Sequence, residues 1–154
     1  MATYHVAMAT NYDQVKQPGS RQDEAFRKTR LDHSNEIAED YVEAIAQLKS
    51  EDGVCRVTKL ARHLGVSHVT ANRTVARLVG RGLVTTRPYQ PIELTASGRT
   101  LADAARKRHE VVLRFLVELG VPEDIANADS EGIEHHCSPQ TLTAMKRFCT
   151  KRNL

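Results

Sequence analysis

The side chains best suited to chemistry lie in the segment 128–138, which reads ADSEGIEHHCS. If this segment is helical, Glu131, Glu134 and His135 stand at i, i+3 and i+4, on one face within a single turn. Two carboxylates beside an imidazole attract a divalent cation, because a cation relieves the repulsion between like charges. A solvated acidic turn with a spare pair of histidines fits the same spacing. The segment alone leaves both interpretations open.

A second pair of carboxylates, Asp40 and Glu43, stands at i and i+3 in another predicted helix. That helix is expected to start near Ser34, with Ser34 or Asp32 as its N-cap. Its apolar stripe consists of Ile37, Tyr41, Ala44, Ile45 and Leu48. Two acidic residues at the edge of such a stripe are usually ordinary boundary residues whose carboxylates are exposed to solvent. A second paired-carboxylate face in one chain makes that explanation weaker.

Charge is distributed unevenly along the chain, although the net charge is only +3. Residues 55–114 hold 12 Lys and Arg against 3 Asp and Glu, whereas both flanking segments are acidic. Charge that served only solubility would be spread more evenly. The basic centre therefore predicts a surface that binds nucleic acid.

The basic centre also has the pattern of a winged helix-turn-helix. A short helix over 57–63 is followed by Gly65, and Ser67 is placed to cap a second helix over 68–80 with Ala71, Val75, Leu78 and Val79 facing inward. The β-branched runs 84–86 and 92–94 flank Arg87-Pro88-Tyr89-Gln90-Pro91, which predicts a hairpin wing. The start of a recognition helix meets base edges, and later Arg residues meet phosphates. The predicted DNA contacts are Ser67, His68, Thr70, Asn72, Arg73, Arg77 and Arg87.

A long helix from Ala96 to about Leu119 should begin at a Thr95 cap and end at Gly120. It is apolar over so wide an arc in its second half that it should pack on its own domain and on a partner chain, which predicts a homodimer. His109 falls near its buried side, where a histidine is normally a satisfied core residue. Ser138 and Pro139 should begin a final helix that buries Leu142, Met145, Phe148 and Cys149.

The composition predicts a mostly α protein with an N-terminal winged helix-turn-helix DNA-binding domain and a C-terminal helical dimerisation domain. We expect a flexible arm over 1–31, the DNA-binding domain over 32–95, and the linker helix with the dimerisation domain over 96–154. Three cysteines without CxxC spacing indicate neither a disulfide framework nor a zinc ribbon. No signal peptide or apolar span is evident, so a cytoplasmic location is expected, with no membrane partner and no small organic substrate.

Taken together, EDYVE at 39–43, the winged helix, RHE at 108–110 and EGIEHH at 131–136 resemble the DtxR/MntR family of metal-dependent repressors. The resemblance covers about 36–148, and EGIEHH is its most specific part. It implies one metal site built by Asp40, Glu43, His109, Glu131, Glu134 and His135. Cys137 is expected to point away from this set.

The likeness is to the manganese-responsive branch. Its iron-responsive members present Met and Cys where this chain has Asp40 and Glu131, and hard oxygen donors suit Mn²⁺. The chain also leaves no room for the SH3-like third domain of the iron-type regulators. Four carboxylates would balance two divalent ions, so we expect two Mn²⁺ per subunit, with Fe²⁺ as an alternative. The implied function is repression of manganese-uptake genes by metal-dependent binding to operator DNA.

Three other functions remain open at this point. An iron sensor would share the whole architecture. A metal-independent regulator of the multiple-antibiotic-resistance type would share the basic centre but has no reason to keep four carboxylates together. A metallohydrolase would need an open coordination position and a general base, and the residues suited to these roles are used up as ligands. We therefore expect a regulator and not an enzyme.

Overall fold

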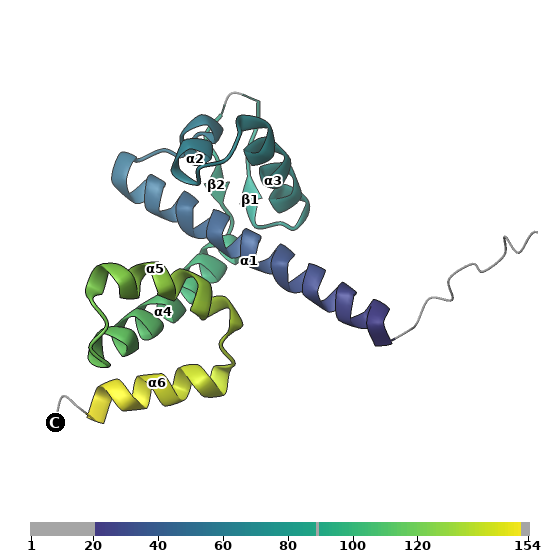
Figure 1. Cartoon of the computed structure of the whole chain (residues 1–154). Helices are drawn as coiled ribbons and strands as arrows, with labels where there is room; N and C mark the ends of the chain where they lie inside the picture. Colours follow the sequence, from purple (N-terminus) through teal and green to yellow (C-terminus); the bar gives the residue numbers. More distant parts are fainter. Residues whose placement is uncertain (1–20, 89, 152–154) are drawn as a thin grey trace, which may run out of the picture. The chain divides into compact units, whose positions relative to one another are not determined.

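The computed structural model describes residues 21–88 and 90–151, and these divide into two units between His33 and Ser34. The elements in order are α1 (Arg21–Asp52), α2 (Val57–His63), α3 (His68–Gly80), β1 (Val84–Thr85), β2 (Glu93–Leu94), α4 (Ala96–Glu118), α5 (Glu123–Ile133), the 3₁₀ helix η1 (Glu134–His136) and α6 (Pro139–Lys151) (Figure 1). This order confirms the mostly α fold class with its small β wing.

Helix α1 begins at Arg21, so the expected N-cap at Asp32 or Ser34 is wrong. Its first turns carry alternating charges and no apolar stripe, which is why hydrophobic periodicity did not detect them. Asp23 and Glu24 in the first turn favour a helix start, because carboxylates interact well with the positive end of the helix dipole. Residues 1–20 of the predicted arm lie outside the described residues.

The unit Ser34–Leu154 has a core in which α1 packs with the winged helix-turn-helix. Its central side chains, Val42, Ile45, Leu60, Leu78 and Ile92, are all 2% exposed or less. Four of them come from the three helices α1, α2 and α3, and Ile92 comes from the segment before β2. Four residues of the stripe predicted for α1 are buried and the fifth, Ile37, is partly buried, and the stripe anchors the helix that carries Asp40 and Glu43.

Local turn chemistry fixes the recognition helix α3. Gly65 adopts a left-handed backbone with φ of 66°, and the Ser67 hydroxyl accepts a hydrogen bond from the backbone N–H of Thr70 at 3.1 Å. Both features match the sequence prediction. One inward residue does not, because Val79 is 41% exposed while Thr74 is buried at 3%. The buried face of α3 therefore consists of Ala71, Thr74, Val75 and Leu78.

The wing is a two-stranded antiparallel sheet that pairs Val84 with Leu94 and Thr85 with Glu93. Both strands are shorter than predicted, since Thr86 and Ile92 lie outside them. The backbone N–H of Ile92 instead donates to the carbonyl of Cys55 at 2.8 Å. This bond ties the wing to the turn between α1 and α2.

Helix α4 starts at the predicted cap, where the Thr95 hydroxyl accepts from the Gly98 N–H at 3.0 Å. It packs against α5 and α6, and the rings of Phe115 and Phe148 meet edge to face with centroids 5.4 Å apart. In the part of the chain that the structure describes, no helix is apolar over enough length to cross a bilayer. These helices bring the acidic segment beside His109 in the interior of α4.

Candidate metal centre and DNA-binding face

The acidic segment is α-helical only as far as Ile133, and the tighter 3₁₀ helix η1 begins at Glu134. The side chains of Glu134 and His135 are 1% and 6% exposed, whereas that of Glu131 is 64% exposed. The single face expected from i, i+3, i+4 spacing is therefore split. Two of its members point into the protein and Glu131 stands at the rim.

His135 is held between two carboxylates of α1. Its Nδ1 lies 3.0 Å from Oε2 of Glu39, and its Nε2 lies 3.2 Å from Oδ1 of Asp40. Burial by itself would lower the pKa of His135, but the hydrogen bond to Glu39 and the charges of Asp40 and Glu134 outweigh it and raise the pKa. The imidazole therefore links η1 to the helix that also carries Glu43.

His109 on α4 meets the other two carboxylates. Its Nδ1 lies 3.3 Å from Oε2 of Glu134 and 3.5 Å from Oε1 of Glu131. Glu134 also approaches His135, with Oε1 at 3.7 Å from Nε2. A continuous series of N···O separations below 4 Å thus connects Asp40, His135, Glu134, His109 and Glu131.

Glu134 is the most constrained member of this series. Burial raises its pKa to about 7, and the neighbouring charges of Glu43 and Glu131 act in the same direction, against the opposing effect of His135. Its Oε2 is buried and finds no hydrogen-bond partner of good geometry among the described residues. A buried carboxylate oxygen without a donor is costly, so a cation bound at this point would stabilise the protein.

Asp40 and Glu43 line a cavity of about 320 Å³ together with Glu131 and His135. Burial raises the pKa of both α1 carboxyls, and the charge of Glu131 raises each of them further. Glu43 interacts electrostatically with Glu131, His109, Asp40 and His135. All six predicted residues therefore surround one electrostatically coupled region.

Within residues 21–88 and 90–151, no group of three or more His, Cys, Asp or Glu side chains is arranged so that it could hold a metal ion as it stands. The reason is visible in the contacts, since Glu131 turns toward solvent and the ring nitrogens of His109 and His135 face carboxylates directly. The donor set nevertheless fits a divalent cation. It offers four carboxylates and two imidazoles, and one of the carboxylates, that of Glu134, has a buried oxygen without a hydrogen-bond partner among the described residues.

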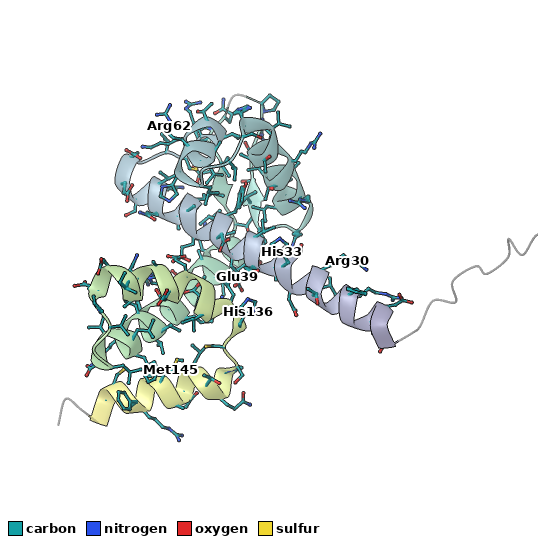
Figure 2. All side chains as sticks on the ribbon, viewed as in Figure 1. Arg30, His33, Glu39, Arg62, His136 and Met145 are labelled. Carbon is teal, nitrogen blue, oxygen red and sulfur yellow. The ribbon has the colours of Figure 1, made fainter. Side chains whose placement is uncertain are left out.

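Sequence reasoning did not single out three residues that lie against this region. Glu39 contacts His135 and forms an ion pair with Arg108, with Oε2 2.6 Å from Nη2 (Figure 2 shows Glu39 beside the segment of His136). The Ser130 hydroxyl lies 3.4 Å from Nδ1 of His109. The spacing of Glu36, Glu39 and Glu43 along one helical face was the available signal for Glu39.

The residues predicted to contact DNA are all exposed, and they lie at the N-cap of α3, on α3 itself or on the wing. His68, Asn72 and Arg87 line a groove of about 570 Å³. Arg56 and Thr58 also line it, and they were not among the DNA contacts predicted from the sequence. Nδ2 of Asn72 and Nδ1 of His68 are 3.0 Å apart, so the two side chains are held together at the start of α3. Ser67 and Thr70 are occupied with the cap, since their hydroxyls also lie 2.9 Å apart.

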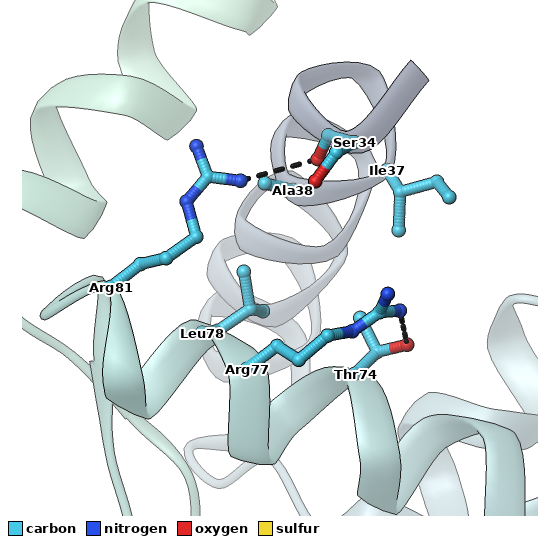
Figure 3. A pocket seen from close by; sticks show the side chains of 7 residues that line it. All are labelled: Ser34, Ile37, Ala38, Thr74, Arg77, Leu78 and Arg81. Atoms are coloured by element: carbon cyan, nitrogen blue, oxygen red, sulfur yellow. Dashed lines mark hydrogen bonds between the residues drawn. The ribbon is translucent and has the colours of Figure 1, made fainter. Parts of the chain in front are cut away.

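Arg77 and Arg81 flank a smaller pocket of about 280 Å³ between α3 and α1 (Figure 3). Arg77 donates from Nη2 to the Thr74 hydroxyl at 2.9 Å. Arg81 donates to the carbonyl of Ser34 at 3.2 Å and to Oδ1 of Asn35 at 2.9 Å. The end of the recognition helix is therefore bonded to the helix that bears Asp40 and Glu43.

The fold and these surfaces define a winged-helix DNA-binding protein with a helical C-terminal domain. Comparison with family models agrees with both halves. Residues 34–92 match the family described as iron dependent repressor, N-terminal DNA binding domain. Residues 95–153 match the one described as iron dependent repressor, metal binding and dimerisation domain.

Two relatives of known name are similar to this chain over most of its length. "Transcriptional regulator MntR" of Escherichia coli O6:H1 strain CFT073 is 43% identical over 128 residues, which is 83% of each chain. "HTH-type transcriptional regulator MntR" of Bacillus subtilis strain 168 is 35% identical over 100 residues, covering 65% of this chain and 70% of that one.

Two solved structures have the same fold over about half of their own length. "Manganese-dependent transcriptional repressor complex with manganese" is 30% identical with a TM-score of 0.62, covering 73% of this chain and 52% of that one. "Crystal structure of T. acidophilum IdeR" has a TM-score of 0.65 at 22% identity, covering 71% and 53%. The second likeness supports the fold alone.

The chain belongs to the DtxR/MntR family of metal-dependent transcriptional repressors. It is a homodimeric repressor that binds operator DNA and takes a divalent metal as cofactor, and it is not an enzyme. The metallohydrolase alternative is set aside on this ground, and the metal-independent regulator is not favoured.

Proposed function

We propose that this repressor senses Mn²⁺ through Asp40, Glu43, His109, Glu131, Glu134 and His135, and then represses genes for manganese uptake. The observation that carries the proposal is the buried Oε2 of Glu134, which lacks a hydrogen-bond partner among the described residues, while two imidazoles and the other carboxylates of the region lie around that side chain. A bound divalent cation would supply the positive charge that this arrangement lacks.

Preference for Mn²⁺ over Fe²⁺ rests on the donor set. All six donors are oxygen or imidazole nitrogen, and no thiolate or thioether competes for softer metals. The printed names of the relatives also support it, since the solved relative at 30% identity is titled as manganese-dependent. Fe²⁺ remains the alternative cofactor.

A stoichiometry of two ions per subunit follows from charge. Asp40, Glu43, Glu131 and Glu134 carry four negative charges when ionised, and one divalent ion would leave two of them uncompensated in a half-buried site. His109 reaches Glu131 and Glu134, while His135 reaches Asp40 and Glu134. Glu134 thus lies between two groups of donors and would be placed to hold both ions.

Coupling to DNA follows from which elements the donors occupy. Asp40 and Glu43 come from α1, which packs into the winged helix-turn-helix core, while the other four come from α4, α5 and η1. In the metal-free protein the carboxylates repel one another across this junction. Neutralising them favours the arrangement in which α1 stays against α4 and η1, so the two DNA-binding domains of a dimer keep one spacing.

Seven residues are proposed to contact the operator. His68 and Asn72 lie at the start of α3 and would meet base edges. Ser67 and Thr70 would hold the start of α3 near the sugar-phosphate backbone of the DNA. Arg73, Arg77 and Arg87 would meet phosphates. We place the domain limits at 1–31, 32–95 and 96–154, which the family matches at 34–92 and 95–153 support, and we expect the protein to act in the cytoplasm.

A selection from random double-stranded DNA in the presence of Mn²⁺ would first supply an operator sequence. Gel shifts with that sequence across Mn²⁺, Fe²⁺ under anaerobic conditions, Zn²⁺ and a chelator then test the proposal. We expect tight binding with Mn²⁺ and loss of binding with chelator. Equal binding with and without metal would overturn the sensing role, and a response to Fe²⁺ but not to Mn²⁺ would favour the iron sensor.

A further inference from the structure

The carboxylate of Glu39 joins three elements of the metal centre without being one of the six proposed ligands. Its Oε2 lies 3.0 Å from Nδ1 of His135 on η1 and 2.6 Å from Nη2 of Arg108 on α4. The side chains of Glu39 and Arg108 are 18% and 24% exposed, and that of His135 is 6% exposed. These contacts are shielded from water, so they are stronger than surface ion pairs.

The contact fixes the chemical state of the His135 ring. An ionised carboxylate can only accept hydrogen bonds, so Nδ1 of His135 must carry the proton. Neutral imidazole in solution prefers the proton on Nε2, the nitrogen that faces Asp40 and Glu134. In the neutral ring Glu39 favours the proton on Nδ1, which leaves the lone pair on Nε2, the nitrogen that lies 3.2 Å from Asp40, for a cation that His135 and Asp40 would share.

Arg108 extends the effect to the second histidine. It precedes His109 in α4, so the ion pair with Glu39 holds the turn of α4 that presents His109 to Glu131 and Glu134. One carboxylate on α1 therefore orients donors on both α4 and η1.

We propose that Glu39 is a positioning residue for the metal centre, holding the Nδ1–H of His135 and the guanidinium of Arg108 so that both histidines present their donor atoms to the carboxylates. This inference rests on the proposed metal-sensing function. It predicts that Glu39→Gln weakens Mn²⁺ binding by about 10- to 100-fold, the range seen when a partner of a metal-bound histidine is removed.

The test is a calorimetric Mn²⁺ titration of the full-length chain as wild type, Glu39→Gln and Glu51→Gln. The Glu51→Gln control makes the same change on an exposed carboxylate of α1 that accepts a hydrogen bond from Gln47 and has no contact with His135 or Arg108 among the ion pairs and hydrogen bonds of the described residues. We expect it to bind within about twofold of wild type. Glu39→Gln binding within the same limit would overturn the proposal.

A second readout separates positioning from a general loss of structure. Nitrogen-15 NMR of the His135 ring in the metal-free protein, at a pH where the imidazole is neutral, should show the proton on Nδ1 in wild type and a shift toward Nε2 in Glu39→Gln. Weaker metal binding with an unchanged ring would mean that Glu39 acts by another route and would refute the assignment.

Two further variants complete the design. If circular dichroism shows that Glu39→Gln is unfolded, Arg108→Gln tests the same carboxylate from its other partner, with a several-fold loss expected and an unchanged affinity counting against the proposal. Glu131→Ala separates this inference from the proposed function. If Glu131→Ala binds Mn²⁺ normally, the site itself is wrong; if only the Glu39 variants bind normally, the site stands and the positioning role falls.

Discussion

Nδ1 of His109 lies 3.3 Å from Oε2 of Glu134, the oxygen that is buried without a hydrogen-bond partner among the described residues. The two side chains come from α4 and η1, and both are less than a fifth exposed. Because neither group can turn to water, their protonation and any bound cation decide how well the two elements pack. The first predictions concern this relationship.

The stability of the metal-free protein should fall as pH rises from about 5 to about 8. The pKa of Asp40, Glu43, Glu134 and His135 is raised in each case, so the folded state binds more protons than the unfolded state. For the carboxyls, the destabilisation caused by ionising them in the folded state is absent below their unfolded pKa. For Glu134 it is complete once the pH is above its raised pKa of about 7. The His135 contribution is present below its ordinary pKa of 6.5 and is lost as pH rises through its raised value. Urea denaturation in the presence of chelator measures the trend.

Glu134→Gln is the matched variant for that experiment. It removes a buried charge but keeps the shape, so the metal-free variant should gain on the order of 2 kcal/mol at about pH 8 and little at about pH 5. It should also lose the response to metal. An equal effect of the substitution at both pH values would show that Glu134 does not titrate in this range.

Glu131→Ala should abolish metal-dependent operator binding while leaving a folded dimer. Glu131 is 64% exposed, so its loss costs little packing, yet it supplies one of the predicted ligands beside His109. Gel shifts and analytical ultracentrifugation measure the two properties. The control is Asp129→Ala, which removes an exposed carboxylate on the same helix that is not a predicted ligand. This variant should bind the operator in response to Mn²⁺ as the wild type does. A Glu131→Ala protein that still responds to Mn²⁺ contradicts the ligand assignment.

Substitutions on α3 should divide into two kinds. Asn72→Ala should reduce discrimination between operator and non-operator DNA by about 1–3 kcal/mol, because it removes a predicted base contact. Arg73→Ala should weaken binding to all sequences similarly and lower the salt dependence by about one ion. Fluorescence anisotropy over a range of salt concentrations distinguishes the two, with Arg114→Ala on α4 as a control. The assignment of roles fails if Asn72→Ala leaves sequence preference intact.

Gly98→Ala should destabilise the fold by about 1–3 kcal/mol. An added Cβ at Gly98 would lie 2.0 Å from the carbonyl oxygen of Leu83, where α4 starts against the wing. At Gly80 nothing lies within 4 Å of an added Cβ, so Gly80→Ala should be neutral or slightly stabilising. Thermal denaturation of both variants checks the contrast, and equal melting temperatures would show that α4 can move away from Leu83.

The sequence was informative wherever periodicity or a cap set the structure. The Ser67 and Thr95 caps, Gly65 and the winged-helix order follow from local chemistry and appear as predicted. It failed where tertiary contacts decide. The start of α1 at Arg21 carries no apolar stripe, and the exposure of Val79 depends on the rotation of α3 against α1.

The same distinction applies to the candidate site. Spacing suggested that Glu131, Glu134 and His135 share a face, but the change to a 3₁₀ helix at Glu134 separates a buried carboxylate from an exposed one. Spacing places Glu39 on the same helical face as Glu36 and Glu43, but it does not show the role of Glu39, which depends on Arg108, 69 positions further along the chain. As metal ligands, the six residues stay a prediction.

The central claim is that distant segments share one cation site, and a crystal grown with Mn²⁺ tests it most directly through anomalous scattering at the manganese edge. We predict two peaks per subunit, surrounded by Asp40, Glu43, His109, Glu131, Glu134 and His135, with Glu134 between them. Manganese bound elsewhere, with Asp40 and Glu43 facing solvent far from His109 and His135, would contradict the account.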